Sequence, residues 1–149
     1  LIEGGQSVNT VAPHAKAEID LRYVQLAQRD AAVGAIREIA ETCSVPDTSA
    51  TLEILGEFNS LNQSPEAKAL FEHYVAAAGE AGLKVEGEFS GGCADSGFTA
   101  AVGTPTLCAT GPVGGNAHSP EEYLEVDSLV PRAQAMAIAI LGAGAVMAA

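Results

Sequence analysis

The chain has 149 residues, of which 19 are acidic and 7 basic, giving a formal net charge of −12 at pH 7. This charge repels phosphate backbones and anionic lipid, so nucleic acid and membrane surfaces are poor partners. Aliphatic residues and alanine are plentiful, while 16 Gly and 7 Pro mark frequent turns, a composition that is typical of α/β or α+β proteins and excludes a disordered chain.

The first predicted element is a hairpin near the N-terminus. Apolar and polar side chains alternate over residues 15–24, a pattern that predicts a half-buried strand. Residues 7–11 are its expected hairpin partner, with the turn at Pro13, because proline is poorly tolerated in a central strand. This pairing would bring Asn9 close to Arg22.

A helix and a further strand are predicted next. Asp30 has the chemistry of an N-cap, and the apolar residues after it recur at helical spacing until Pro46 interrupts them. Residues 51–58 are predicted to form another strand. The order strand, strand, helix, strand is that of the second half of a ferredoxin-like sheet, so we expect residues 1–60 to form one partial domain.

A second unit is expected over residues 61–149. Ser64 is the predicted N-cap and Pro65 the first residue of a helix that Gly82 ends. Residues 133–149 are almost entirely apolar but slightly short for a membrane span, so we expect a buried or docking helix there. The later elements alternate, which favours an α/β layer: a strand at 85–89, a helix at about 96–102, a strand at 106–109 and a final helix from about Ser128.

One histidine lies in a glycine-rich loop directly before a predicted helix start. In residues 111–123, Ser119 is the expected N-cap, Pro120 suits the first helical position and Glu122 completes a capping box. The backbone around His118 is therefore expected to be rigid, as a metal ligand requires. Without any family, a structural loop histidine is the more natural interpretation, because no second cluster of His, Asp or Glu stands at ligand spacing.

This loop, together with the run GGCAD at residues 91–95 and the pair Asn9 and Arg22, resembles the C-terminal part of the di-zinc metallopeptidases. That family includes glutamate carboxypeptidase, acetylornithine deacetylase, succinyl-diaminopimelate desuccinylase and aminoacylase, and the chain is most similar to the glutamate carboxypeptidase branch. The resemblance implies the second half of a ferredoxin-like lid, or dimerization, domain over residues 1–60. The C-terminal part of a zinc-exopeptidase α/β catalytic domain would follow over residues 61–149. Family members are more than twice as long, so the chain is expected to be a fragment.

The resemblance implies a role for three residues in particular. The histidine that matches His118 is a terminal ligand of one zinc ion, and neutral imidazole binds zinc without adding charge. Asn9 and Arg22 stand where the family keeps an Asn and an Arg that grip the substrate carboxylate, which a planar guanidinium binds through paired charge-assisted hydrogen bonds. Without the resemblance, Arg22 is a solvated side chain paired with Glu18 or Asp20.

Alternatives stay open for four further residues. Gly91 and Gly92 either let the backbone approach the substrate closely or simply make a turn. Asp95 either caps the next helix or, as its family position implies, helps to order the active-site loop. Glu122 either completes the capping box or supports the implied metal ligand His118 from a neighbouring position.

The implied full-length enzyme is a zinc-dependent exopeptidase or amidohydrolase, which removes a C-terminal amino acid such as glutamate or deacylates an N-acyl amino acid. Two zinc ions would activate a bridging water and polarise the scissile carbonyl, and a glutamate base would transfer the proton. The base and most metal ligands belong to the missing N-terminal half. We therefore expect no hydrolysis by this chain alone. The resemblance also implies a homodimer through the lid domain. A non-catalytic dimerization or carboxylate-binding module is the alternative function.

Other residues carry weaker signals. The three cysteines stand far apart in the sequence and are expected to be mostly buried thiols: Cys43, Cys93 and Cys108. His14 and His73 are expected to be surface residues. No signal peptide is visible, and the compartment stays open, with the cytoplasm slightly favoured.

Overall fold

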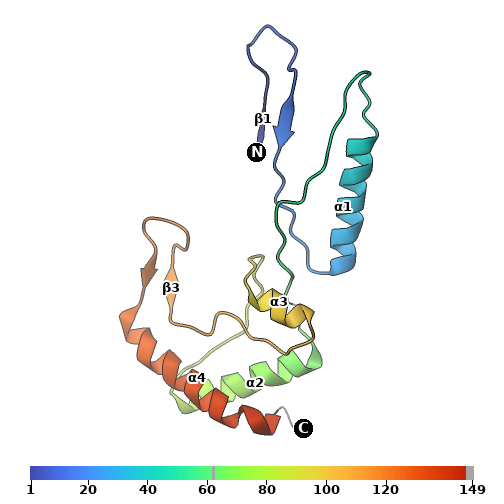
Figure 1. Cartoon of the computed structure of the whole chain (residues 1–149). Coiled ribbons are helices and arrows are strands. Elements are labelled where there is room, and N and C mark those ends of the chain that lie inside the picture. The colour runs from blue at the N-terminus through green and yellow to red at the C-terminus, as the bar shows by residue number, and fades with distance from the viewer. Residues whose placement is uncertain (62, 147–149) are drawn as a thin grey trace. The chain divides into compact units, whose positions relative to one another are not determined.

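The computed structural model describes residues 1–61 and 63–146. It combines helices with short antiparallel strands (Figure 1), so the expected mixed α/β class is confirmed. Internal contacts divide the chain into two compact units, Leu1–Glu53 and Ile54–Ala149. The assignment of residues 1–60 to a lid domain and of residues 61–149 to a catalytic domain stays a prediction.

The first unit begins with a hairpin that is shorter than expected. Strand β1 (Ile2–Gly4) pairs antiparallel with β2 (Ala15–Ala17). A Cβ at Gly4 would lie 2.8 Å from the Ala15 side chain, so glycine permits this close approach. The ladder closes where the amide of Gly5 donates to the His14 carbonyl at 3.2 Å.

The predicted partner strand is therefore wrong. Residues 7–11 lie in the hairpin loop, and the predicted strand over 15–24 is limited to its first three residues. The register explains the difference, because Gly4 faces Ala15 at the loop end and the last bonds of the hairpin join Leu1 to Glu18, at 2.9 and 3.0 Å. Asn9 consequently lies in the hairpin loop, whereas Arg22 follows the second strand at the open end of the hairpin.

Helix α1 (Leu26–Glu41) completes the first unit. It begins after Gln25, not after Asp30, because Gln25 and Gln28 form a capping box in which the Gln25 amide donates to the Gln28 side chain at 3.0 Å. Asp30 lies inside the helix and pairs with the neighbouring Arg29 at 2.9 Å. The predicted start is therefore wrong, whereas the helix ends before Pro46 as predicted.

The second unit begins with helix α2 (Pro65–Glu80), whose predicted ends are confirmed. The Ser64 hydroxyl accepts a hydrogen bond from the Ala67 amide at 3.1 Å, and Pro65 is the first helical residue. At the other end, Gly82 has φ +75° and the Leu83 amide donates to the Ala78 carbonyl at 2.8 Å. Local capping chemistry thus defines both ends of this helix.

Ser64→Ala is expected to lower the free energy of unfolding of the second unit by about 1 kcal/mol at neutral pH, because the cap bond is lost. The Ser64 side chain, followed by the backbone amide of Glu66, holds the pKa of the Glu66 carboxyl below its ordinary value. A lowered folded-state pKa stabilises the fold above the unfolded pKa, and this contribution disappears as the pH falls through the folded value. Urea unfolding at neutral and acid pH, with NMR titration of Glu66, measures both effects.

Ser44→Ala is the matched control for this cap, since Ser44 is exposed and outside any helix. We expect it to leave both the unfolding free energy and the Glu66 titration unchanged. A Glu66 pKa that does not rise in Ser64→Ala would contradict the capping role.

The core of the second unit is the packing of α2 against α4 (Val126–Val146). Alanines dominate this contact, so the two helices approach closely, and one tyrosine is buried among them: Tyr74, Ala77, Ala78, Ala135 and Ala139. His73, expected at the surface, is half-buried, with its Nε2 atom 2.8 Å from the Ala139 carbonyl oxygen. A Cβ at Gly142 would lie 2.7 Å from the His73 ring, so glycine makes room for this contact.

Three predicted strands are absent from the described part of the chain. Residues 51–58, 85–89 and 106–109 are in no strand, and the second unit's ladder joins only β3 (Gly114–Gly115) and β4 (Tyr123–Leu124). A strand satisfies its backbone groups through a ladder with a neighbouring strand, and none of these three segments joins a ladder with another described residue. The predicted ferredoxin-like sheet and α/β layer are therefore not formed by the described residues alone.

Helix α4 is apolar on the face that α2 covers and also on the opposite face. Large side chains on its outer face are exposed: Val126, Val130, Ile140 and Leu141. By length and composition it is also the one described helix that could span a membrane, over Val126–Gly144, which is weak evidence because core helices pass the same test. Helix α4 begins two residues before its predicted start at Ser128. Residues 147–149, the end of the predicted apolar stretch, lie outside the residues that the structure describes.

The cysteine prediction is wrong for two of the three thiols. Cys93 and Cys108 are exposed, and Cys43 is half-buried at the end of the first unit's helix, where its thiol donates to the Ala40 carbonyl at 3.3 Å. All three are free thiols in the structure.

Candidate functional site

The loop that carries His118 is closed by a short antiparallel ladder. Gly114 lies opposite Leu124, and Gly115 opposite Tyr123. A Cβ at Gly114 would lie 2.5 Å from the Tyr123 carbonyl oxygen, and a Cβ at Gly115 would lie 2.7 Å from the Tyr123 ring. Both glycines are therefore needed for the close approach of the two strands. Residues 116–122 form the loop between them.

Two residues of this loop have left-handed backbone conformations. Asn116 has φ +56° and His118 has φ +66°. This conformation costs an ordinary residue about 1–2 kcal/mol, so it persists only where surrounding contacts enforce it. Ser119 provides such contacts, because its hydroxyl and its amide both donate to the Asn116 carbonyl, at 2.8 and 3.2 Å.

The predicted helix start at Ser119 is wrong, because the chain makes one turn and then enters β4 at Tyr123. The Ser119 hydroxyl accepts from the Glu121 amide at 3.2 Å, as in an N-cap, but no helix follows. The Glu122 carboxylate accepts from the backbone amide of His118 at 3.3 Å, one residue before the predicted cap. Glu122 thus contacts His118 directly through its backbone.

The His118 side chain is exposed and its ring makes no hydrogen bond to another described residue. The imidazole therefore remains accessible to a metal ion, while its backbone is held by the loop. Within residues 1–61 and 63–146, however, no group of three or more His, Cys, Asp or Glu side chains is arranged to hold a metal. Since zinc sites in proteins use three or four protein ligands, the described residues do not form a complete zinc site by themselves.

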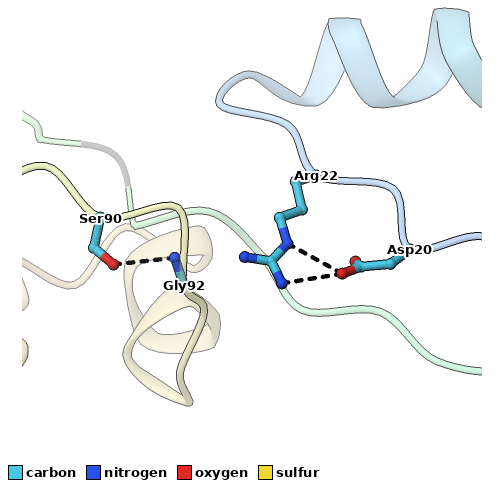
Figure 2. Close-up of polar contacts among 4 residues, drawn as sticks. All are labelled: Asp20, Arg22, Ser90 and Gly92. Carbon is cyan, nitrogen blue, oxygen red and sulfur yellow. Dashed lines mark hydrogen bonds and ion pairs between the residues drawn. The ribbon is translucent and has the colours of Figure 1, made fainter. Parts of the chain in front are cut away.

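The run at residues 91–95 forms a turn before a short helix, α3 (Ser96–Ala101). Figure 2 shows the Gly92 amide donating to the Ser90 hydroxyl at 3.1 Å. Asp95 stands at the N-cap position of α3, but it has helical backbone angles and its side chain makes no cap hydrogen bond. The predicted capping role of Asp95 is therefore wrong, and its other interpretation, in ordering the loop, stays a prediction.

Helix α3 is fixed in the second unit by a glycine contact. A Cβ at Gly97 would lie 1.9 Å from the Asn59 carbonyl oxygen, so only glycine fits against this backbone. Phe58 and Phe98 add a ring contact, with centroids 5.4 Å apart. These contacts anchor the segment that follows Gly91 and Gly92.

The two candidate substrate-binding residues lie in the first unit. Arg22 donates from Nε and Nη2 to one carboxylate oxygen of Asp20, at 3.1 and 3.0 Å (Figure 2). Both side chains are about two-thirds or more exposed, at 67% and 73%. The Asn9 side chain accepts from the Ser7 hydroxyl at 2.8 Å in the hairpin loop. The structure does not bring Asn9 and Arg22 together, and their substrate role stays a prediction.

Three residues that hold the His118 loop were not singled out from the sequence: Tyr74, Ser128 and Arg132. Tyr74 and Arg132 form hydrogen bonds next to the start of the loop, and Ser128 bonds the Val113 amide at 2.9 Å. One signal was available, because Asp127 and Arg132 are the only charged residues of α4. A lone arginine on an apolar helix indicates a specific polar partner.

Comparison with known proteins identifies relatives of this chain. Residues 2–142 match the family described as peptidase family M20/M25/M40. Carboxypeptidase G2 of Pseudomonas sp. (strain RS-16) is 30% identical over 150 aligned residues, which cover 97% of this chain and 36% of that protein. The chain thus spans about a third of the length of this relative. No solved structure matches it. Because the family match covers nearly the whole chain, the protein belongs to peptidase family M20/M25/M40.

Proposed function

We propose that this chain is the C-terminal part of a zinc-dependent exopeptidase or amidohydrolase that hydrolyses a C-terminal peptide bond or an N-acyl amino acid. The observation that carries the proposal is the peptidase family match over residues 2–142, which includes the His118 loop. The similarity to a protein named carboxypeptidase G2 favours a substrate with a free carboxylate. The proposed homodimer through the lid domain belongs to the same hypothesis.

In this proposal His118 is one zinc ligand, and bound zinc would polarise the scissile carbonyl. The accessible imidazole and the held backbone support this role, since a ligand gains affinity when its position is set before the metal binds. Glu122 fixes the His118 amide, and Arg22 would bind the substrate carboxylate, with Asn9 as a second donor only if the two residues come together when substrate binds. The remaining ligands, the second zinc site and the catalytic base would come from residues outside this chain.

A docking role for the outer face of α4 follows from the same proposal. Four large apolar side chains are exposed there, and a helix that is apolar all round is normally covered on both sides. We propose that the preceding half of the same enzyme covers this face. Self-association of the isolated chain, measured by light scattering, is the expected consequence, and Ile140→Lys with Leu141→Lys should reduce it.

The isolated 149-residue chain is expected not to hydrolyse acyl-glutamates, with or without added zinc. A single imidazole binds zinc weakly, because the ion needs two or three further protein ligands. Calorimetry with zinc chloride should therefore give weak heats that change little in His118→Ala. The control is the same chain expressed with the preceding part of its reading frame, which should bind zinc tightly and turn over substrate.

Two results would contradict the proposal. Turnover by the isolated chain that disappears in His118→Ala would show that the described residues already form a complete site. A longer polypeptide that folds but neither binds zinc nor hydrolyses any N-acyl amino acid would favour the alternative function. In that alternative, a carboxylate-binding module, glutarate binding would be lost in Arg22→Ala and unaffected by a chelator.

A further inference from the structure

Helices α2 and α4 hold the β3–β4 hairpin that carries the His118 loop, both at the segment before β3 and at the base of the hairpin. At the start, the Tyr74 hydroxyl donates to the Thr110 carbonyl at 3.3 Å, and Arg132 Nη1 donates to the same hydroxyl at 3.4 Å. Tyr74 is only 4% exposed, so water competes little for these long bonds. The residue before Thr110, Ala109, has φ +57°, a conformation that needs support from its surroundings.

The base of the hairpin is held by Ser128. Its hydroxyl accepts from the Val113 amide at 2.9 Å and donates to the Glu125 carbonyl at 2.6 Å. The Glu125 amide in turn donates to the Val113 carbonyl at 2.9 Å, which extends the β3–β4 ladder by one bond. Val113, Glu125 and Ser128 therefore form a closed set of bonds at the base of the hairpin.

We propose that Tyr74, Ser128 and Arg132 form a clamp that sets the position of His118. The clamp residues do not contact His118 and are positioning residues. Ser128 and Arg132 are one helical turn apart on α4, so they share a face. That helix packs on α2 through buried alanines, and the clamp therefore stands on the packed core of the unit.

The charge of Arg132 favours this interpretation over simple helix packing. A guanidinium half-buried on an apolar helix is costly unless it has a polar partner. Its bond to Tyr74 polarises the hydroxyl and strengthens the donation to Thr110. Packing alone would need only the tyrosine ring. Instead, the Arg132–Tyr74 and Tyr74–Thr110 bonds connect both helices to the backbone that precedes residues 111–118.

The test uses Tyr74→Phe and Ser128→Ala in the isotope-labelled 149-residue chain, without metal or substrate. Each removes a hydroxyl while keeping the helices packed. Loss of one hydrogen bond is expected to lower the exchange protection of the Gly115 and Glu125 amides by about fivefold to tenfold. The strong NOE between the amide and α-proton of His118, which a positive φ produces, should weaken at the same time.

Tyr123→Phe is the matched control, because Tyr123 is closer to His118 in sequence and its hydroxyl bonds no other described residue. It should leave the NOE and the protection unchanged. Arg132→Lys should retain more loop protection than Arg132→Leu, since lysine still donates to the tyrosine hydroxyl. The functional meaning of the clamp rests on the proposed zinc role of His118. The test itself does not, because amide protection and the NOE are measured in the loop without metal.

Two results would overturn the clamp. In one, the loop keeps its protection and its NOE in both Tyr74→Phe and Ser128→Ala. In the other, amides of α2 and α4 lose protection as much as the loop does, which would show that the three residues serve helix packing. Failure of the proposed function is separate, since it would appear as a longer enzyme with an intact loop that does not bind zinc.

Discussion

His118→Ala is expected to lower kcat/KM of the proposed full-length enzyme by more than roughly 100-fold, since removing even a group that supports a zinc ligand commonly costs 10- to 100-fold. His118 is accessible, lies in a left-handed conformation and is held through its backbone by Glu122 and by the hairpin. The measurement is steady-state hydrolysis of an acyl-glutamate, together with the zinc content of the purified protein by mass spectrometry. Zinc content is expected to fall with activity.

His14→Ala is the control for this experiment, because His14 is also exposed and also lies in a hairpin loop. It should retain both zinc and activity. His118→Cys provides a second comparison, since a thiolate is a zinc ligand and should restore part of the bound metal. Full zinc content and full activity in His118→Ala would show that His118 is not a zinc ligand.

Local chemistry explains which elements were predicted correctly. The ends of α2 follow from Ser64, Pro65 and Gly82, each of which acts on the backbone within a few residues of itself. The start of α1 was missed because Asp30 is a good cap type, but Gln25 and Gln28 cap each other earlier. Competing local signals of similar strength cannot be ranked from the sequence alone.

Strand predictions failed for a different reason. Apolar segments such as residues 51–58 carry the correct pattern, but a strand forms only when a second segment supplies hydrogen-bond partners. The pattern of one segment does not identify that second segment or determine the register, and the described ladders join only β1 to β2 and β3 to β4. Ile54, Leu55 and Phe58 are exposed in the structure, which is consistent with a face that the described residues do not cover.

The candidate site was partly predictable. The sequence indicated a rigid glycine-rich loop at His118, and the loop is held as expected, although by a hairpin and not by a helix start. The clamp residues were missed because Tyr74 bonds two residues that are distant in the sequence: Thr110, which is 36 positions away, and Arg132, which is 58 positions away. Contacts at such separations depend on how the helices pack, which helical periodicity alone does not specify. The predicted substrate and metal roles of the site residues stay predictions.

Arg22→Ala is expected to raise KM of the proposed full-length enzyme for its proposed acyl-glutamate substrate by about 10- to 100-fold, because hydrogen bonds to charged groups contribute roughly 1.5–3 kcal/mol. Little change in kcat is expected if the carboxylate is held equally in the ground and transition states. In the structure the guanidinium already binds a carboxylate, that of Asp20, through two bonds. Such an exposed pair is weak, so a substrate carboxylate can replace Asp20 at small cost.

Arg22→Lys separates charge from geometry in this experiment. Lysine keeps the positive charge but cannot form the paired, planar bonds of a guanidinium, so its KM should lie between those of the wild type and of Arg22→Ala. Asp20→Asn removes one internal competitor of the substrate carboxylate and is expected to lower KM slightly. The control is Arg37→Ala, because Arg37 is exposed on α1 and has no proposed role. Equal KM values in the wild type and Arg22→Ala, or an effect of the same size in Arg37→Ala, would show that Arg22 does not bind the substrate.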